Sequence, residues 1–592
     1  MTDQRNLILA IVLSLVILLS FQFFYEFPKL EDMHEEQVRQ SEALGGGKIL
    51  PETPVSGIDP DLPVPSPTAH PESLSVPGVE SQVSVVESRQ TVIDRSPRIE
   101  IVSSRLRGSI NRIGGRIDDI TLVGYRETID PDSPEITLLS PPGAGDTYYA
   151  EVGWVPATAG VKVPRADTEW KANNAALAPG SPVDLTWDNG AGLTFTRHVG
   201  LDEKYVFTLT QRVKNTSSQS VTLYPYGLIK RHGTPSTLGF YILHEGPLGV
   251  FDGTLTEIDY EDLQAGGERK VRSTGGWLGI TDKYWLVALL PDQTIPFNGG
   301  FKYSGRDGPA RYQVDYVHEQ GVTIAPNETV EVTNRIFTGA KINSVLDEYE
   351  TRLPVTRFDL AIDWGWFYFL TKPIFFSLEY LNSVLGNLGL AILALTIVIK
   401  IIFFPLANKS YKAMSKMKKV QPKMMELREK YKDDKEKMQK ELMDLYKREN
   451  ANPLSGCLPI LVQIPVFFAL YKVLFVSIEP RHAPFFGWIK DLSAPDPTSL
   501  FNLFGLLPWD SPEFLVIGIW PLLMGGTMYL QQKISPQPAD PTQAKIMMLL
   551  PILFTFLFAT FPAGLVIYWT WNNVLSIAQQ WIIMKRMGVP TS

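Results

Sequence analysis

The chain has 592 residues, one cysteine and a formal net charge of −8, so it has room for several domains and cannot form an internal disulfide. Its mean hydropathy of −0.01 averages two unlike regions. Residues 26–358 carry 31 Lys and Arg against 45 Asp and Glu, which is typical of an acidic soluble segment, whereas apolar runs of membrane-spanning length dominate from residue 388 onward. This excludes a single soluble globular domain.

An apolar run lies near the start of the chain. Leu7–Phe24 has 18 residues, about the minimum that spans a bilayer. A cleaved signal peptide is the alternative interpretation, but no A-x-A-like site follows, so we predict an uncleaved transmembrane anchor over residues 1–25. Residues 26–85 are rich in Pro, Ser, Glu and Gly and cannot bury enough apolar surface to become ordered, so we predict a flexible linker there.

Residues 86–358 are predicted to form a soluble β-domain. Apolar and polar positions alternate in stretches such as DDITLVGY, KYVFTLTQRV and YWLVALLP, which are separated by Gly, Pro, Asn and Asp. This period of two predicts antiparallel strands, and so many strands in one segment indicate a large β-sandwich. A helix over Lys341–Arg352 is expected to close the domain.

The remainder of the chain predicts membrane helices. Trp364–Leu385 is aromatic but contains Lys372, Pro373 and Glu379, so we expect an amphipathic helix at the membrane interface within residues 359–386. Five candidate spans follow: Leu388–Leu406, Leu454–Val476, Phe514–Leu530, Ile546–Phe561 and Leu565–Ile583. With the anchor they make six transmembrane helices, the second within residues 387–408 and the third to sixth, with a short basic tail, within residues 451–592.

A basic loop separates the second and third predicted spans. Residues 409–450 contain 14 Lys and Arg, 8 Asp and Glu, and six methionines. They predict two helices, with Pro422 at a first-turn position and the polar YKDDKEK at the turn. The loop is either a hairpin packed on itself or a docking platform for a polyanionic partner or for apolar segments. The positive-inside rule makes the loop and both termini cytoplasmic and places the β-domain outside.

Lys400 is the only formal charge between Glu379 and Lys409, in the middle of the apolar LTIVIKIIFFPL. A lysine at the centre of a membrane helix costs about 2.5–3.5 kcal/mol on insertion scales. One interpretation is that its long side chain snorkels to the cytoplasmic headgroups. The other is that it faces a wet cavity between helices.

Polar residues on other spans favour the cavity. Thr396 lies one turn before Lys400, and Gln463 lies in the middle of the next apolar run. The last span carries four polar residues at spacings of four, four and three, which places them on one helix face: Tyr568, Asn572, Ser576 and Gln579. Lipid cannot satisfy such groups, so polar positions on three spans predict the lining of one compartment.

The sequence carries little of the chemistry expected of an enzyme. It has no HExxH, GxSxG or complete Walker A motif, and its seven histidines show no metal-ligand spacing. Paired carboxylates are missing from the predicted spans, which argues against a proton-coupled pump. We therefore predict no catalytic residue, no metal and no cofactor.

Several segments resemble the bacterial YidC membrane protein insertases. The most specific are NPLSGCLPILVQIPVFFALYKVL (452–474), FPAGLVIYWTWNNVLSIAQQ (561–580) and FFPLANKSYKAMSKMKKVQPKM (403–424). The opening DQRNLIL and DLSAPDP (491–497) match as well. The resemblance covers nearly the whole chain in order, and is looser in the β-domain, where GGRIDDITL and WLGITDKYWLVALLP match best.

The resemblance implies a function and a site. Family members insert and fold membrane proteins in the bacterial inner membrane, alone or beside the Sec translocon, through a hydrophilic groove enclosed by five spans. A positive residue in the groove is a family hallmark, and here it is Lys400, where many members carry arginine. The positions implied to line the groove or to meet the client are Lys400, Thr396, Gln463, Tyr568, Trp569, Asn572 and Ser576.

Further expectations rest on the same resemblance. The loop 409–450 corresponds to a cytoplasmic hairpin that recruits clients, through Lys416, Met417, Lys418, Lys419 and Met424. The β-domain corresponds to a β-supersandwich that is less essential to insertion. The implied partners are nascent membrane proteins, the Sec translocon, a ribosome near the cytoplasmic loops and membrane lipids, but not DNA.

Two other functions stay open at this stage. One is a transporter or lipid-handling protein, which should show two halves with matching broken helices, and we find no such repeat. The other is a membrane-anchored binding module in which the β-domain is the working part. Deletion of residues 60–340 distinguishes a binding module from an insertase. A binding module should lose all function, whereas an insertase should tolerate much of this deletion.

Overall fold

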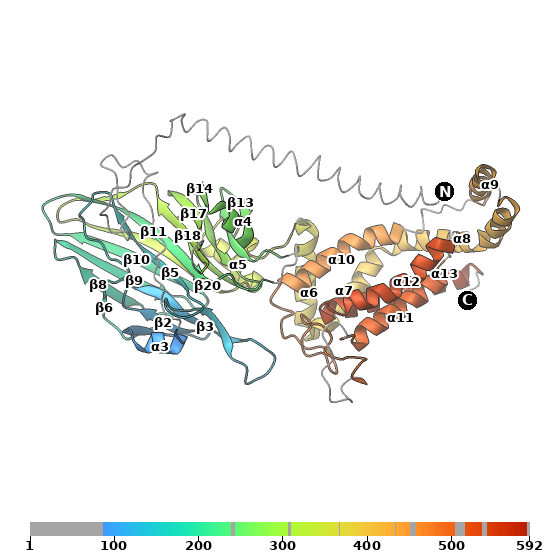
Figure 1. Cartoon of the computed structure of the whole chain (residues 1–592), viewed down its shortest axis with the longest axis horizontal. Coiled ribbons are helices and arrows are strands. Elements are labelled where there is room, and N and C mark those ends of the chain that lie inside the picture. Colours follow the sequence, from blue (N-terminus) through green and yellow to red (C-terminus); the bar gives the residue numbers. More distant parts are fainter. Residues whose placement is uncertain are drawn as a thin grey trace. The chain divides into compact units, whose positions relative to one another are not determined.

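The computed structural model describes residues 87–237, 243–305, 309–365, 367–432, 434–449, 458–503, 516–535 and 541–588. The predicted anchor (1–25) and linker (26–85) lie outside these ranges. Strands occupy the chain from residue 98 to residue 340, and helices follow from residue 343 to residue 586 (Figure 1). Two short helices, α3 (Arg89–Asp94) and α4 (Tyr260–Gly266), accompany the strands. The predicted change from a β-domain to a helical region is therefore confirmed.

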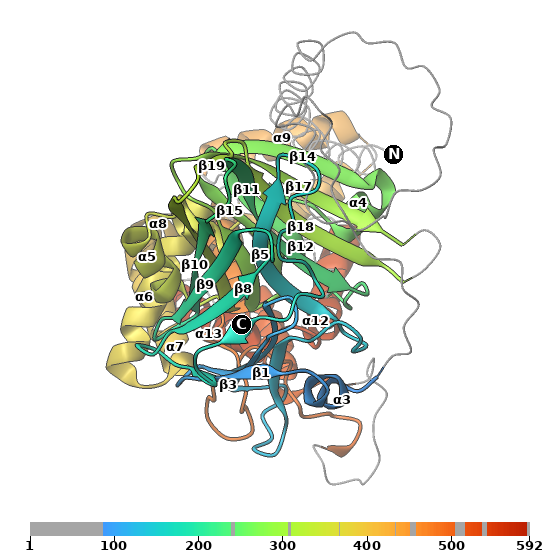
Figure 2. The same ribbon diagram turned by 90° about the vertical axis from the view of Figure 1, so that its left-hand side faces the viewer.

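The strands form two sheets, which are antiparallel except where β1 meets β7. The 11-stranded sheet has the order β14 (Glu268–Thr274), β17 (Pro296–Ser304), β18 (Arg311–His318), β11 (Val221–His232), β5 (Tyr148–Pro156), β3 (Arg116–Arg126), β2 (Leu106–Asn111), β1 (Arg98–Val102) and β7 (Ala176–Leu177), with β4 (Glu135–Leu139) beside β3 and β19 (Val322–Ile324) beside β11. The 9-stranded sheet has the order β13 (Thr254–Glu257), β12 (Gly246–Phe251), β15 (Gly276–Thr281), β16 (Trp285–Leu290), β20 (Thr329–Ala340), β10 (Val206–Asn215), β9 (Leu193–Leu201), β8 (Val183–Asp188) and β6 (Lys171–Ala172). Figure 2 shows β10, β9 and β8 as successive neighbours in this sheet.

The alternating pattern works as predicted where one face of a strand is covered. In β9 every second side chain from Leu193 to Leu201 is buried, and the residues between them are at least partly exposed. In β5 all nine residues from Tyr148 to Pro156 are buried, because both faces of this central strand are covered. Alternation therefore locates the outer strands better than the central ones.

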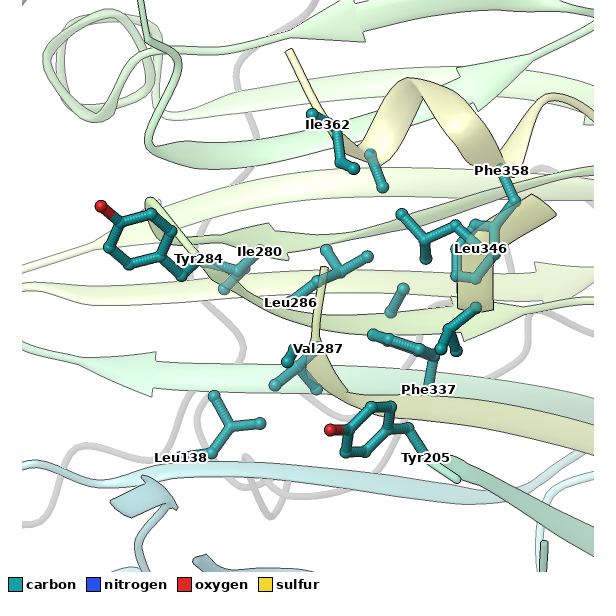
Figure 3. Close-up of a cluster of buried hydrophobic side chains, with 14 of the residues drawn as sticks. Leu138, Tyr205, Ile280, Tyr284, Leu286, Val287, Phe337, Leu346, Phe358 and Ile362 are labelled. Carbon is teal, nitrogen blue, oxygen red and sulfur yellow. The ribbon is translucent and has the colours of Figure 1, made fainter. Parts of the chain in front are cut away.

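The two sheets share one apolar core. The hydroxyl of Tyr148 in the first sheet donates to the carbonyl oxygen of Ile280 in the second, at 3.2 Å. Figure 3 shows Phe337, Leu346 and Phe358 converging from β20, α5 (Asn343–Arg352) and the 3-10 helix η3 (Phe358–Ala361). The ring centroids of Phe337 and Phe358 are 5.3 Å apart in an edge-to-face arrangement, which favours aromatic contact. The predicted closing helix is thus confirmed, beginning at Asn343 instead of Lys341.

Eight helices in the described part of the chain follow this core. They are α6 (Tyr368–Leu385), α7 (Leu388–Ile402), α8 (Phe404–Lys430), α9 (Lys435–Arg448), α10 (Leu458–Val476), α11 (Ile519–Ile534), α12 (Pro541–Phe558) and α13 (Ala563–Arg586). By length and composition, none of the described helices could cross a bilayer alone; α7 and α8 meet the requirement only as a pair bent by 70°, and Gln463–Val476 and Lys545–Phe558 are shorter apolar helices. The number of six spans stays a prediction.

The helix predicted over Leu388–Leu406 ends earlier than expected. α7 stops at Ile402, and α8 begins at Phe404 in a new direction. Pro405 explains the break, because it has no amide hydrogen for the carbonyl of Ile401 and its ring clashes with that carbonyl. The proline instead occupies the first turn of α8, where a missing donor does no harm.

Two smaller expectations were also wrong. Pro422 does not lie in a first turn but inside α8, which continues through it to Lys430; α9 begins at Lys435, so the break between the two helices lies within the predicted YKDDKEK. The expected interfacial helix begins at Tyr368 and not at Trp364. Trp364 is buried against Phe375, with ring centroids 5.1 Å apart, and its indole nitrogen donates to a backbone carbonyl. Packing of this one side chain therefore sets where the helix can start.

Candidate functional site

A small cavity lies where α7, α8, α10 and α13 meet. Its lining residues are Thr396, Ile399, Lys400, Phe403, Leu406, Ala407, Tyr411, Gln463, Val466, Tyr568 and Asn572. The bend at Phe403 creates this arrangement, because it brings the first turns of α8 over the end of α7. The cavity has a volume of about 50 Å³, which is enough for a few water molecules.

Lys400 contributes the charge of this cavity. Its Nζ donates to the hydroxyl of Ser576 at 2.7 Å, and that hydroxyl donates in turn to the carbonyl oxygen of Asn572 at 2.8 Å. Tyr411 of α8 lines the same cavity. Within the described ranges Lys400 makes no ion pair with a carboxylate, so its positive charge is solvated by neutral groups but not neutralised.

The other polar residues of the cavity are partly satisfied by their own neighbours. Thr396 is buried, and its hydroxyl donates to the carbonyl of Ile392 one turn earlier, at 2.7 Å. Tyr568 is buried, and it lines the cavity from α13 together with Gln463 of α10. The cavity is therefore lined by groups that can donate or accept hydrogen bonds without carrying a compensating negative charge.

The spacing of the polar row on α13 predicted that all four residues face one compartment, but the structure places Gln579 elsewhere. Tyr568 and Asn572 line the cavity and Ser576 lies against Lys400, but Gln579 lines a second cleft further along the helix. At about 100° per residue Gln579 still points to the same side of α13 as Tyr568 and Asn572, but it lies eleven residues, about 16 Å, further along the axis than Tyr568, which places it beyond the cavity.

Trp569 also lies away from the cavity. Its ring packs edge to face on Phe467 of α10, with centroids 4.5 Å apart, and lies 5.0 Å from Phe558 of α12. It belongs to an aromatic cluster that joins three helices. Of the residues implied by the resemblance, the structure brings together Lys400, Thr396, Gln463, Tyr568, Asn572 and Ser576, and leaves Trp569 outside.

Tyr411 is a cavity residue that the sequence did not reveal. It lies in SYKAMSKM, a polar and basic stretch that carries no membrane signal. Recognising it requires knowledge of the bend at Phe403, which returns α8 over the cavity. A signal was present only indirectly, in the proline two residues after that bend.

Lysines of the hairpin formed by α8 and α9 contact the ends of other helices. Lys418 Nζ donates to the carbonyl oxygen of Ile534 at the end of α11, at 3.4 Å, and Lys419 Nζ donates to that of Met587 after α13, at 2.8 Å. Helix C-termini present unpaired carbonyls and a partial negative charge, which lysines complement. Lys416 is exposed.

The hairpin also has a small core of its own. Met424 is buried with Val420 and Leu445, and Met417 packs against them, so α8 and α9 are held together by these side chains. Met425 and Met443, two further methionines of the hairpin, are 65% and 51% exposed. Two of the named methionines therefore stabilise the hairpin, and two others are available on its surface.

Comparison with known families defines the class of protein first. Residues 98–377 match the family model described as the YidC periplasmic domain, and residues 380–589 match the one described as the 60Kd inner membrane protein. The chain is thus an inner-membrane protein with a periplasmic domain made mostly of strands.

Individual relatives then identify the family. Proteins named membrane protein insertase YidC are 50% identical in Beijerinckia indica and 49% identical in Methylorubrum extorquens; both alignments cover 99% of this chain and 96% of the relative. A crystal structure of an active YidC insertase with its first transmembrane domain resolved has a TM-score of 0.33 at 16% identity, over 81% of this chain and 92% of the other. The chain belongs to the YidC family of membrane protein insertases, which are not enzymes.

Proposed function

We propose that this insertase moves the polar part of a client into the membrane through the cavity beside Lys400. The observation that carries the proposal is a cation held by a single side-chain hydroxyl, with no carboxylate partner among the described residues. A buried charge without a counter-charge attracts an anionic group strongly, because the surroundings screen it less than water does. An acidic segment of a client provides such a group.

The size of the cavity adds a requirement. A volume of about 50 Å³ holds a few waters but not a peptide segment, so the cavity has to widen when a client enters. α8 is the element whose displacement opens it, because α8 meets α7 at the break beside Pro405 and contributes Leu406, Ala407 and Tyr411 to the lining. The lysines of α8 that cap α11 and α13 hold it in the closed position.

The driving force of the proposed step is transfer of the client's apolar segment into lipid. Each buried methylene contributes about 0.8 kcal/mol, so a spanning segment of about twenty residues exceeds the penalty for moving a short polar tail. The cavity lowers that penalty by offering hydrogen-bonding groups and a positive charge part of the way across. Nucleotide hydrolysis is not required for such a step.

The arrangement in the membrane follows from the charges. We infer six spans with both termini in the cytoplasm, a transmembrane anchor at 1–25, a linker at 26–85, the periplasmic β-domain at 86–358, an interfacial helix at 359–386, the second span at 387–408, the cytoplasmic hairpin at 409–450 and the remaining spans at 451–592. The basic loop 409–450 supports this orientation through the positive-inside rule.

The partners belong to the same proposal. Nascent membrane proteins reach the cavity from the cytoplasmic side, where the hairpin presents Lys416 and the exposed Met425 and Met443. Exposed methionines suit apolar segments of varied shape, and basic residues suit ribosomal RNA or acidic tails. Cooperation with the Sec translocon and a chaperone role in folding complete the expected activity.

Site-specific photocrosslinking tests the client path. A photoreactive residue replaces Thr396, Gln463 or Tyr568 in turn, so that Lys400 keeps its charge, and a stalled nascent membrane protein serves as the client. Val398, on the same helix as Lys400 and 44% exposed, is the matched control. Crosslinks from the three cavity positions and none from residue 398 support the proposal, and equal or absent crosslinks at all four positions overturn it.

A further inference from the structure

A second cleft lies between α7, the start of α8 and the end of α13. Its lining residues are Ile397, Lys400, Ile401, Phe404, Asn408, Lys412, Leu575, Gln579, Ile582, Ile583, Arg586 and Met587. Its volume of about 570 Å³ is more than ten times that of the first cavity and falls within the range of small-molecule sites. The proposed insertion path does not use it, although Lys400 borders both spaces.

One end of the cleft is cationic. Lys412 on α8 and Arg586 in the last turn of α13 are exposed, and Lys400 lies deeper. The lining contains no Asp or Glu, and neither Lys412 nor Arg586 forms an ion pair with any described residue. Because no acidic residue lines the cleft, the three cations favour the binding of an anion there.

Gln579 supplies an independent sign of a missing ligand. Its side-chain nitrogen is buried and has no hydrogen-bond partner among the described residues. A buried amide donor without an acceptor costs about 1–3 kcal/mol, so such groups are usually paired. An oxygen-rich group in the cleft satisfies this donor and the three cations together.

The other end of the cleft is apolar and open. Ile397 and Leu575 are the lining residues of α7 and α13 that lie farthest along their helices from Lys412 and Arg586, and Ile397 and Ile401 are 41% and 66% exposed, in helices of a membrane protein. From Leu575 to Arg586 the cleft follows α13 for eleven residues, which is about 16 Å at 1.5 Å per residue. It therefore passes from an apolar end to a cationic end over the length that separates acyl chains from a headgroup.

We propose that this cleft binds one anionic phospholipid. The phosphate accepts hydrogen bonds from Lys412 and Arg586, an ester carbonyl oxygen deeper in the cleft accepts one from Gln579, and the acyl chains lie along Ile397, Ile401 and Leu575. Bound there, the lipid bridges α13 and the first turns of α8, the element that closes the client cavity. Lys400 borders both spaces, but Lys412, Gln579 and Arg586, which define the lipid site, do not line the proposed client cavity.

Native mass spectrometry of the full-length protein in a mild neutral detergent tests the proposal. Phosphatidylglycerol and phosphatidylcholine with identical acyl chains are the two probes. We expect phosphatidylglycerol to bind at least about tenfold more tightly, because each cation near a membrane surface contributes about fivefold to the affinity for an anionic lipid. Lys412→Gln with Arg586→Gln should remove this preference, and Gln579→Leu should weaken it by about fivefold.

The control keeps the number of changed charges constant. Lys416→Gln with Lys585→Gln removes two exposed lysines from the same two helices, neither of which lines the cleft. This variant should retain the preference for phosphatidylglycerol, and Lys412→Arg with Arg586→Lys should retain it too. Equal binding of the two lipids by the unchanged protein, or an equal loss in the control variant, overturns the proposal.

Two competitors distinguish the occupant. Inorganic phosphate carries the headgroup charge without acyl chains, and a soluble acidic peptide carries the charge of a client tail. Neither should displace phosphatidylglycerol at millimolar concentration. Displacement by phosphate would make the cleft a simple anion site, displacement by the peptide would make it part of the client path, and either result refutes a lipid site.

Discussion

The β-domain and the helical region treat buried charges in opposite ways. In the β-domain, Arg116 Nε lies 2.7 Å from a carboxylate oxygen of Glu151, and both side chains are nearly buried. Burial by itself raises the pKa of Glu151, but Arg116 and Lys230 reverse this effect and leave that pKa below its usual value. In the helical region, Lys400 has one serine hydroxyl as its partner. We therefore interpret the Arg116–Glu151 pair as a contribution to the stability of the fold, and the unneutralised charge of Lys400 as the group that attracts a client.

Arg197 shows that a counter-charge is not the only solution. It is buried in the β-domain, and its guanidinium donates to the carbonyls of Gly115 and Val152 at 2.7 and 2.6 Å while lying over the ring of Trp170. Burial lowers its pKa to about 10. Two of its three nitrogens have carbonyl partners fixed by the sheet, although Nε has no partner among the described residues, whereas Lys400 has a single hydroxyl.

The largest expected effect comes from breaking the paired charge. Glu151→Ala leaves Arg116 buried without its carboxylate, and such a change costs about 3–5 kcal/mol of unfolding free energy. Chemical denaturation of the full-length protein, followed by the signal of the β-domain, measures this loss. Glu203→Ala, at an exposed position of the same domain, should change the unfolding free energy by less than about 0.5 kcal/mol. Equal effects would show that the ion pair is not structural.

The second largest expected effect is a change of folding stability with pH, which arises from a buried neutral histidine. His318 is 2% exposed and stacks on Tyr316, and burial lowers its pKa to about 4. The folded state therefore resists protonation that the unfolded state accepts near pH 6.5. Stability is unaffected above pH 6.5 and should fall as the pH drops toward 4, by about 3 kcal/mol for this group.

Thermal unfolding measured from pH 7 to pH 4 isolates this contribution. His318→Phe should lose less stability over that range than the unchanged protein, because it removes the titrating group and keeps an aromatic ring beside Tyr316. A parallel profile for His318→Phe would refute the assignment.

The unneutralised charge should affect function more than stability. Lys400→Met removes the charge and keeps the length of the side chain, so we expect insertion of a client with an acidic tail to slow by at least about tenfold, the value of a hydrogen bond to a charged group. Reconstituted insertion into vesicles measures the rate. Lys400→Arg should retain most of it, and a client with a neutral tail should be nearly insensitive.

The unfolding free energy of Lys400→Met sharpens the comparison with Glu151→Ala. The lysine is not needed to compensate another charge among the described residues, so its replacement by an apolar side chain should leave stability unchanged or increase it. A loss of several kcal/mol would place Lys400 with the structural charges of the β-domain.

Ser576→Ala gives the smallest expected effect. It removes the only side-chain hydroxyl that accepts from Lys400 in the described residues, which is worth about 1 kcal/mol or less because water in the cavity can replace it. Insertion of the acidic client should change by no more than about fivefold. If the variant behaves like Lys400→Met, the hydroxyl orients the lysine and the two act as one unit.

The sequence by itself determined most of the local structure. Alternation in Leu193–Leu201, the closing helix before Arg352 and the turn between α8 and α9 all follow from short-range patterns of apolar and polar residues. Such patterns report which residues face inward within one element. They also identify Lys400 as unusual, because a charged residue in an apolar run is costly to insert into a membrane.

Only the tertiary structure decided which residues of other helices these faces contact. Pro405 bends the chain by 70° between α7 and α8, which brings Tyr411 over the cavity, and the packing of α13 sends Gln579 to the second cleft and Trp569 to an aromatic cluster. Periodicity along one helix holds no information about its neighbours. The environment of Lys400 depends on how separate helices are placed against each other, and that placement is settled by side-chain packing over long sequence distances.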